Sequence, residues 1–241
     1  MRLVTGLQPV REAIRVHGGK LERVLVEEKG GPQIDAVARF AEGRGATVVR
    51  VPRSELDRTS KGARHQGAIA FAPDFALVPI EVLADELDER ALVVALDELE
   101  DPQNFGAVIR SAVAMGASAI LWPEHHSAPL SPATFRASAG AVEHAALCRV
   151  TSLPKALERL RDAGARVIGL DANAAKTIAE TPMEGAVVLV IGAEGKGLRK
   201  LVRTACSDLA KLPMSGTIDS LNASVAAGIA LYEVVRRRGS P

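Results

Sequence analysis

The chain alternates uninterrupted apolar runs with segments of helical periodicity, and this alternation constrains its fold more than any other feature. Residues 91–96 and 187–191 are continuous apolar runs, which is the pattern of parallel strands buried on both faces. Apolar residues recur at helical spacing over 105–115 and 154–163, and a glycine follows each of these segments. Strands that alternate with helices in this way predict an α/β domain with a mostly parallel sheet.

The whole chain of 241 residues is long enough for one large domain or two small ones. The predicted strands lie at 24–26, 47–51, 68–71, 91–96, 119–122, 166–170, 187–191 and 209–212, and the predicted helices lie at 7–17, 34–42, 79–87, 105–115, 132–141, 154–163, 198–205 and 221–238. We therefore predict a small N-terminal α/β domain over 1–73, an acidic, proline-containing linker over 74–88, and a larger α/β domain over 89–241.

The composition excludes several classes of protein. Hydrophobic residues make up 47% of the chain and the formal net charge is +1, which excludes a disordered protein. The sequence has no run of about 18 apolar residues, so no membrane-spanning helix is expected, and the first residues lack the apolar core of a signal peptide. Cys148 and Cys206 have no CxxC spacing, which favours reduced thiols and a cytoplasmic protein.

The small net charge hides an uneven distribution. Residues 1–75 carry 13 Lys+Arg and 9 Asp+Glu, residues 76–123 carry 2 and 9, and residues 124–241 carry 15 and 11. Two basic stretches therefore flank an acidic one. This pattern keeps open a local basic surface for a polyanion, although a solvated acidic linker would explain the acidic stretch equally well.

Three loops of the larger domain follow predicted strands, and ligands of open α/β sheets bind at the carboxyl ends of the strands. The first loop, DELEDPQN (97–104), leads into a helix that carries Asn104 and Arg110. Arg110 stands among apolar residues, where an arginine needs an anionic or polar partner. A helix cap at Asn104 and a surface charge at Arg110 would also account for these two residues.

The second and third loops add a glycine-rich turn and polar residues at a helix start. A G-x-x-G-x-G run over 192–197 permits a sharp turn around Glu194, because glycine adopts backbone conformations that other residues avoid. Its glycine order is neither a dinucleotide fingerprint nor a Walker A loop. In the third loop, Ser220 is the expected N-cap of the last helix and Asn222 lies in the first turn. Helix capping alone would also explain Ser220 and Asn222.

The remaining candidates are weaker. His125 and His126 are adjacent but have no further metal ligand nearby in the sequence, so no metal site is expected. His65 lies in the polar loop TSKGARHQG (59–67), where contacting RNA and holding a turn are both open. The glycine-rich turn taken alone would suggest a nucleotide-dependent oxidoreductase, but its glycine order disagrees with that class.

Together the three loops closely resemble the three sequence motifs of the SpoU (TrmH-like) branch of the SPOUT RNA methyltransferases. The matching stretches are DPQNFGAVIRSA (101–112), LVIGAEGKGL (189–198) and LPMSGTIDSLNASVA (212–226). GLQPVREAI (6–14) and ARHQGAIA (63–70) look like the small substrate-binding domain that precedes the methyltransferase domain in the 23S rRNA guanosine-2′-O-methyltransferase subfamily. The resemblance covers nearly the whole chain except the linker.

The resemblance implies an S-adenosylmethionine-dependent methyltransferase that acts on the 2′-oxygen of a ribose in 23S rRNA, most naturally that of a guanosine. It also implies a SPOUT α/β domain with a C-terminal trefoil knot, and a homodimer that builds the site near the subunit interface. Carried over by motif, the reaction site consists of Asn104, Arg110, Glu194, Ser220 and Asn222, and the cofactor lies against Gly192, Leu212, Met214 and Leu221.

For the N-terminal domain, the resemblance implies binding of structured RNA. Only 3% of the residues are aromatic, so contacts to the RNA backbone are expected to outweigh base stacking. The expected contact residues are Arg58, Lys61, Arg64 and His65. The alternatives are a tRNA guanosine-2′-O-methyltransferase, a 23S rRNA adenosine-2′-O-methyltransferase, and a non-enzymatic RNA-binding or ribosome-assembly factor, against which the intact motif residues argue.

Overall fold

The computed structural model describes residues 1–217 and 220–239 of the chain, and these residues form two compact units. The first unit holds Met1–Phe75 together with Leu130–His144, and the second holds Ala76–Pro129 with the described residues from Ala145 onward. The predicted boundaries, 1–73 and 89–241, differ from this division. No local sequence pattern shows on which unit the stretch 130–144 packs.

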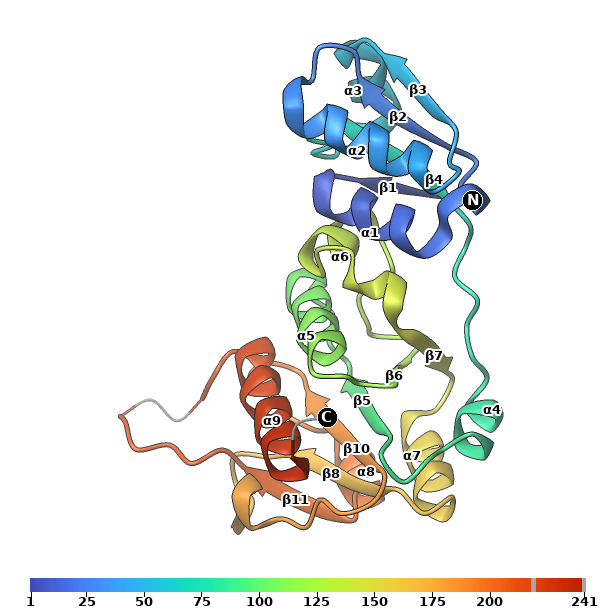
Figure 1. The fold of residues 1–241 in the computed structure, drawn as a ribbon. Helices are drawn as coiled ribbons and strands as arrows, with labels where there is room; N and C mark the ends of the chain where they lie inside the picture. Colours follow the sequence, from blue (N-terminus) through green and yellow to red (C-terminus); the bar gives the residue numbers. More distant parts are fainter. Residues whose placement is uncertain (218–219, 240–241) are drawn as a thin grey trace. The chain divides into compact units, whose positions relative to one another are not determined.

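The described residues of the first unit contain a four-stranded sheet in the order β1-β4-β2-β3 (Figure 1). Its strands are β1 (Arg2–Thr5), β2 (Arg23–Glu27), β3 (Val48–Val51) and β4 (Ala68–Ala72). β4 is antiparallel to both of its neighbours, whereas β2 and β3 are parallel. Sequence patterning predicts all of these strands except β1.

Helices cover both faces of this small sheet. α1 (Leu7–His17), followed by the 3-10 turn η1 (Gly18–Lys20), and α2 (Gly31–Gly43) cover one face, and α3 (Arg53–Ser60) covers the other. The alternation of side chains along a strand explains the arrangement. Ala68 and Ala70 of β4 pack under α1 and α2, whereas Ile69 packs on the opposite side with Leu56 of α3.

The stretch Leu130–His144 completes the first unit. It forms α6 (Pro132–Ala137) and the 3-10 turn η2 (Ala141–His144), which contact α1 and β1. Sequence periodicity predicts one helix over 132–141 instead of these two short elements. The break between them lies at Ala139 and Gly140, whose φ angles of 51° and 83° are incompatible with a continuous right-handed helix.

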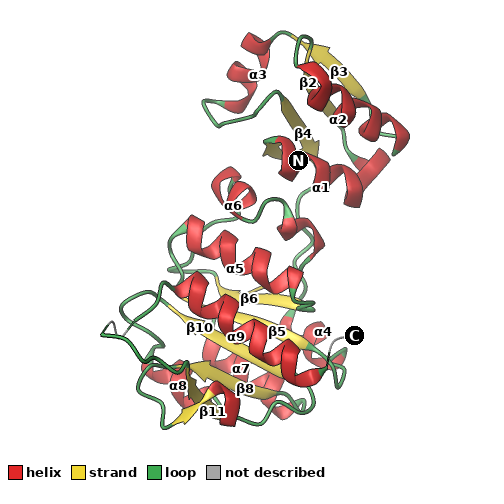
Figure 2. Ribbon diagram, turned by 60° about the vertical axis from the view of Figure 1, so that its left-hand side comes forward, coloured by secondary structure: helices red, strands yellow, loops and turns green. Residues whose placement is uncertain are grey.

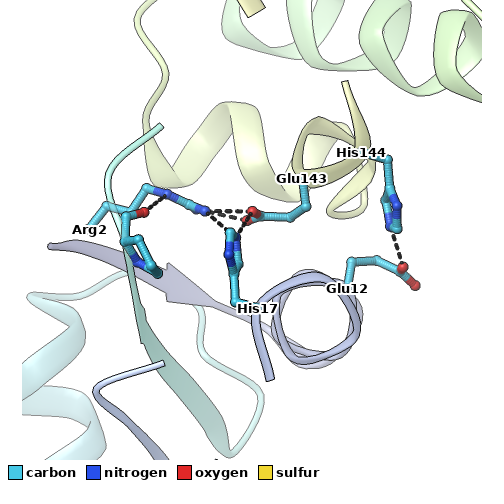
Figure 3. Close-up of polar contacts among 6 residues, drawn as sticks. Arg2, Glu12, His17, Glu143 and His144 are labelled. Carbon is cyan, nitrogen blue, oxygen red and sulfur yellow. Dashed lines mark hydrogen bonds and ion pairs between the residues drawn. The ribbon is translucent and has the colours of Figure 1, made fainter. Parts of the chain in front are cut away.

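Charged and polar side chains join this stretch to the rest of the first unit, and the pairs around Glu143 are buried (Figure 3). The side chain of Glu143 is only 1% exposed, and it accepts a hydrogen bond from Nη1 of Arg2 at 2.7 Å and lies 3.0 Å from Nε2 of His17. A second pair places Nε2 of His144 2.8 Å from Oε2 of Glu12. Charge-assisted hydrogen bonds of this kind are stronger than neutral ones.

The described residues of the second unit form a seven-stranded sheet in the order β7-β6-β5-β10-β8-β11-β9 (Figure 2). Its strands are β5 (Leu92–Asp97), β6 (Ala119–Pro123), β7 (Ala146–Val150), β8 (Arg166–Leu170), β9 (Lys176–Thr177), β10 (Val187–Gly192) and β11 (Asp208–Lys211). Neighbouring strands are parallel throughout this described sheet. β6, which follows β5 in the chain, pairs with one edge of β5, and β10 pairs with the other edge. The strand order therefore reverses between β5 and β10.

Helices cover both faces of the parallel sheet as well (Figure 2). α5 (Pro102–Ala114) and α9 (Ala223–Arg238) lie side by side on one face. α4 (Ile80–Asp85), α7 (Leu153–Asp162) and α8 (Lys200–Ala205) pack on the other, where Val93 of β5 belongs to the same core cluster as Leu157 and Val202. The predicted linker 74–88 thus contains α4, and Ala84 of α4 joins this core. The 3-10 turn η3 (Ile178–Glu180) precedes β10.

A small mixed-sheet domain and a larger parallel α/β domain confirm the predicted fold class. The trefoil knot that the resemblance implies stays a prediction. Among the helices that the structure describes, none has the length and apolar character needed to cross a bilayer. The point where the strand order reverses, between β5 and β10, is where a parallel sheet of this kind opens a crevice for ligands.

Candidate active site

Three side chains from three separate loops meet beyond the carboxyl ends of the parallel strands. Nδ2 of Asn104 donates to Oε2 of Glu194 at 3.1 Å. Nδ2 of Asn222 donates to Oδ1 of Asn104 at 2.9 Å and to Oε2 of Glu194 at 3.1 Å. The three side chains form a closed triangle of hydrogen bonds, called the polar triangle below. The structure therefore brings together one predicted residue from each of the three loops.

A helix cap places Asn104. The carboxylate of Asp101 accepts hydrogen bonds from the backbone N–H groups of Gln103 and Asn104, at 3.2 and 3.0 Å, at the start of α5. Asp101 therefore satisfies free backbone donors of the first helical turn. The side chain of Asn104 does not cap the helix and bonds to Glu194 instead.

Asn222 is the N-cap of α9. Its Oδ1 accepts a hydrogen bond from the backbone N–H of Ser224 at 3.0 Å and from the Ser224 hydroxyl at 2.6 Å. The prediction that Ser220 caps this helix is wrong, because the cap lies two residues later at Asn222. Ser220 instead lines a hollow beside the polar triangle.

This hollow has a volume of about 210 Å³ and lies among the chain segments that follow β8, β10 and β11. Its lining includes the four residues predicted to hold a cofactor, namely Gly192, Leu212, Met214 and Leu221. Glu194 and Ser220 also line it. Sequence reasoning missed the stretch 170–172 at the end of β8 and two alanines of α9, Ala223 and Ala226. The rule that ligands bind at carboxyl ends of strands could have indicated 170–172.

A close approach of backbone requires glycine at position 192. A Cβ atom on Gly192 would lie 2.3 Å from the carbonyl carbon of Gly197. A hydrogen bond from the N–H of Gly197 to the carbonyl of Ala193, at 2.8 Å, closes the turn between them. Gly195 and Gly197 have φ angles of 75° and 65°, the left-handed region that favours glycine. The glycine run is thus a tight turn that presents Glu194 to solvent.

The hollow combines apolar walls with the carboxylates of Asp171 and Glu194. Leu170, Ile191 and Leu212 supply much of the apolar lining, and Glu194 places its carboxylate beside them. Lys211 is the cation among the lining residues that the structure describes. Apolar walls with a few placed polar groups are typical of small-molecule sites. This lining fits a flat apolar ring attached to a positively charged group better than it fits a phosphate.

Arg110 lies in α5, and its side chain is exposed. The apolar neighbours do not enclose Arg110, because α5 turns Phe105, Val108 and Ile109 inward. Within 1–217 and 220–239, no hydrogen-bond or ion-pair partner of Arg110 is found. The guanidinium is therefore available to a ligand that approaches α5 from solvent.

The residues predicted to bind RNA lie in the first unit, in α3 and in the loop that leads to β4. Three of them are exposed cations, Arg58, Lys61 and Arg64. The His65 side chain is only 5% exposed. Its Nε2 lies 2.9 Å from Oδ1 of Asp57, and its Nδ1 accepts a hydrogen bond from the N–H of Gly67 at 3.0 Å. With both ring nitrogens engaged, His65 holds the loop that carries the cations.

Metal ligands do not gather anywhere in the described residues, where no group of three or more His, Cys, Asp or Glu side chains is placed to hold an ion. His125 and His126 are exposed and lie beside Glu124 and Glu100 respectively. Cys148 and Cys206 are free thiols. The side chains predicted to form the reaction site supply amides, a carboxylate, a hydroxyl and a guanidinium.

Residues 91–232 match the SpoU rRNA Methylase family. The chain belongs to this family. Residues 3–76 match a second family, described as RNA 2′-O ribose methyltransferase substrate binding. The protein is thus an RNA methyltransferase of the SpoU class with a substrate-binding domain, and the resemblance found in the sequence is confirmed.

Known methyltransferases match the chain almost from end to end. A Bacillus subtilis (strain 168) protein, YacO, which is named as a TrmH family tRNA/rRNA methyltransferase, is 38% identical over 238 residues, or 98% of this chain and 95% of YacO. The AdoMet-bound rRNA methyltransferase of Sinorhizobium meliloti has a TM-score of 0.79 at 28% identity and covers 99% of this chain and 88% of its own. AviRb of Streptomyces viridochromogenes is a SpoU methyltransferase solved in complex with AdoMet. It has a TM-score of 0.78 at 27% identity, and the match covers 98% of this chain and 90% of AviRb.

Proposed function

We propose that the protein methylates the 2′-oxygen of a ribose in 23S rRNA, with S-adenosylmethionine as the methyl donor and a guanosine as the modified nucleoside. The observation that carries the proposal is the polar triangle of Asn104, Glu194 and Asn222 beside the apolar hollow. Family membership and the substrate-binding domain support RNA as the substrate. The two AdoMet-bound neighbours support the donor.

The lining of the hollow fits S-adenosylmethionine by its chemistry. Leu170, Ile191 and Leu212 offer aliphatic surface on which an adenine ring is buried favourably. The Glu194 carboxylate would favour the positive sulfur of the donor by charge attraction. The absence of a side chain at Gly192 allows the backbone of Gly197 to approach closely and so closes the turn that lines the hollow. When bound, S-adenosylmethionine supplies an activated methyl group to the reaction.

The chain itself then has two tasks, to align the ribose with the methyl group and to let the 2′-hydroxyl lose its proton. Alignment supplies much of the rate enhancement in a transfer of this kind. Asn104 and Glu194, which the polar triangle holds in place, position the target nucleotide. Ser220 and Asn222 hold the ribose or the segment that lines the cofactor hollow.

Arg110 stabilises negative charge in this scheme. A guanidinium keeps its proton up to about pH 12, so Arg110 does not remove the hydroxyl proton at neutral pH. Its exposed guanidinium on α5 binds the phosphate of the target nucleotide and stabilises the negative charge that develops on the attacking 2′-oxygen. Water would accept the hydroxyl proton while the oxygen–carbon bond forms and the carbon–sulfur bond of the donor breaks, so that the donor would leave as a neutral thioether.

The first unit grips the RNA in this proposal. Arg58, Lys61 and Arg64 are exposed and provide contacts to phosphates, which carry no base specificity. His65, predicted as a direct contact, acts through the loop that it holds by its bonds to Asp57 and Gly67. The protein acts in the cytoplasm, where ribosomal RNA is made in bacteria.

Exposed apolar residues of α9 support the homodimer. Val225, Ile229 and Tyr232 are 49%, 45% and 56% exposed, and their spacing places them on one side of the helix. A contiguous apolar surface of this kind marks an interaction site. A second copy of the chain that covered α9 would lie close to the Asn222 cap at the start of the same helix.

The proposal is tested by methylating 23S rRNA in vitro with the purified protein and S-adenosylmethionine, and by mapping 2′-O-methyl nucleotides. The expected result is one modified guanosine, which is unmodified in rRNA from a strain that lacks the gene. A set of tRNA transcripts tests the tRNA alternative, and a modified adenosine in 23S rRNA would support the other sibling activity. The proposal is overturned when the protein binds RNA but transfers no methyl group to any of these substrates.

A further inference from the structure

Asp97, which the sequence motifs leave unassigned, is a fully buried carboxylate at the carboxyl end of β5. Its Oδ2 accepts a hydrogen bond from the backbone N–H of Arg199 at 2.8 Å, and its Oδ1 accepts from Nε of the same arginine at 2.7 Å. Removing a charge from water is costly unless it is paired and hydrogen-bonded. Arg199 supplies both kinds of compensation to Asp97.

Arg199 also reaches the residue next to Asp97. Its Nη1 lies 2.8 Å from Oε1 of Glu98, so one guanidinium bridges two consecutive carboxylates. Glu98 has a φ angle of 57°, in the left-handed region that non-glycine residues avoid. Such strain persists only where surrounding contacts maintain it, and it concentrates at functional sites.

The position of this ion pair relates it to the polar triangle. Gly192, where the glycine turn begins, is the sheet partner of Asp97 in the parallel pairing of β10 with β5. Arg199, just beyond the end of that turn, bonds to the side chain of Asp97. The turn that presents Glu194 therefore starts beside Asp97 in the sheet and ends at a residue bonded to the Asp97 carboxylate, and Asp97 also begins the loop that leads to Asn104.

We propose that Asp97 and Arg199 are positioning residues that fix the Glu194 turn against the loop of Asn104, and thereby shape the cofactor hollow. Neither residue lines the hollow, so any effect on catalysis is indirect. For that effect the inference rests on the proposed function. Its structural content can be measured without any cofactor: the turn begins at the sheet partner of Asp97, and its far end is bonded to the Asp97 carboxylate through Arg199.

The test compares Arg199→Ala with Arg199→Lys and with a matched control, Arg166→Ala. Arg166 makes a similar ion pair to Asp208 at 2.7 Å, and its side chain is 37% exposed against 42% for Arg199. The Arg166 pair lies where β8 and β11 begin, at the opposite end of the strands from the candidate site. Thermal unfolding of each variant records the general loss of stability.

Three readouts separate a positioning role from a structural one. Arg199→Ala is expected to weaken S-adenosylmethionine binding in calorimetry about tenfold, the effect of losing one charge-assisted contact, and to lower kcat while RNA affinity stays unchanged. Arg199→Lys is expected to recover part of the loss, and Arg166→Ala to leave binding and kcat unchanged. Amide hydrogen exchange over 193–198 is expected to rise at least tenfold in Arg199→Ala alone.

Unchanged exchange over 193–198 in Arg199→Ala overturns the proposal, as do equal effects of Arg199→Ala and Arg166→Ala on cofactor binding. The exchange measurement needs no cofactor. A wild-type protein that bound no S-adenosylmethionine would therefore count against the proposed function. The exchange data alone decide whether Asp97 and Arg199 fix the Glu194 turn.

Discussion

At the scale of single residues, Asn222 performs two tasks with one side chain. Its Oδ1 caps α9, and its Nδ2 donates to Asn104 and Glu194. An amide carries an acceptor oxygen and a donor nitrogen as two separate atoms of one terminal group. Position 222 therefore couples the start of a helix to the geometry of the candidate active site.

Asn222→Asp separates these two tasks. A carboxylate remains a good helix cap, but it cannot donate to Asn104 and it sets a second negative charge against Glu194. We expect the thermal midpoint to stay close to wild type, and kcat/KM to fall about 100-fold, the usual effect of losing one placed polar group in an active site. Methyl transfer to 23S rRNA and thermal unfolding measure the two quantities.

Asn222→Ala is the matched control, because it removes the cap as well as the donor. The cap contributes about 1 kcal/mol, so this variant is expected to lose both stability and activity. An Asn222→Asp variant with the wild-type rate would show that the polar triangle has no part in catalysis.

The two thiols give a prediction about pH. Burial, above all, raises the pKa of Cys148 to about 11 and that of Cys206 to about 12, from an ordinary value of 9.0. Only the thiolate reacts with disulfide reagents. At pH 8 both thiols of the native protein are expected to react slowly with such a reagent. In denaturant, both thiols are expected to react at once, which gives two equivalents of the reagent's released thiol for each chain.

The same pKa shifts act on stability. The unfolded chain begins to lose its thiol protons near pH 9, whereas the folded chain keeps them until about pH 11 or 12. This part of the free energy of unfolding is complete below pH 9 and falls as the pH rises above it. Rapid reaction of both thiols in the native protein at pH 8 would contradict the prediction. In the Cys206→Ser variant, the slow reaction that remains belongs to Cys148.

At the scale of elements, the sequence predicts the parallel sheet well where local chemistry decides the structure. The apolar runs at 91–96 and 187–191 become β5 and β10, and the loops after them carry Asn104 and Glu194 as predicted. Strands β1, β7 and β9 are not predicted. β1 is half exposed in its first two residues and is defined by pairing with β4, far along the chain. Pairing across such a distance leaves little local signal.

The candidate site shows the same limit. Motifs identify the residues that line the hollow after β10 and β11, but Asp97 and Arg199 are linked across the sheet by an ion pair that no spacing reveals. Helix caps are also uncertain from sequence, because Asp, Ser and Asn are all good caps. At α5 and α9 the choice falls on Asp101 and Asn222.

The break between α6 and η2 gives a prediction at the element scale. A Cβ atom on Gly140 would lie 2.9 Å from Cα of Pro9, a backbone atom that cannot swing away, and the φ angle of Gly140 is 83°. Gly140→Ala is therefore expected to lower the free energy of unfolding of the first unit by about 1–3 kcal/mol, from overpacking and backbone strain together. Chemical denaturation followed by circular dichroism measures the loss.

Gly116→Ala is the control for backbone strain alone. Gly116 also has a left-handed φ angle, 76°, but a Cβ atom there would meet nothing within 4 Å. The amount by which Gly140→Ala lowers the free energy of unfolding more than Gly116→Ala does reports the close packing of η2 on α1. Equal losses in the two variants would show that this packing tolerates a methyl group.

At the scale of the whole molecule, the chain passes between the two units three times, after residues 75, 129 and 144. The substrate-binding family match covers residues 3–76 and so omits 130–144. Yet this stretch provides Glu143, the buried partner of Arg2 and His17 (Figure 3). The first unit is a single folding core drawn from two separate parts of the sequence.

Glu143→Ala tests how much the first unit depends on this stretch. The side chains of Arg2 and Glu143 are 10% and 1% exposed, and removing one partner of a buried pair leaves an uncompensated charge. We expect the first unit to lose about 3 kcal/mol of stability. Trp122, the single tryptophan, lies in the second unit, so hydrogen exchange over residues 2–27 is the suitable measurement.

Glu158→Ala is the control, since Glu158 is an exposed residue of α7 in the second unit. Its effect is expected to stay within about 0.5 kcal/mol, as for most surface substitutions. A Glu143→Ala variant with unchanged exchange in β1, α1 and β2 would show that the stretch 130–144 does not stabilise the first unit.

The two-part first unit has a consequence for how such proteins exchange domains during evolution. A recombination event that replaced residues 1–75 alone would bring in a new partner for η2 while the old Glu143 stayed behind. The incoming segment would need a cation at the position of Arg2 and a histidine or equivalent near His17. A stable first unit can therefore be transplanted between relatives only when two distant stretches of the gene, or a compatible charge pair, travel together.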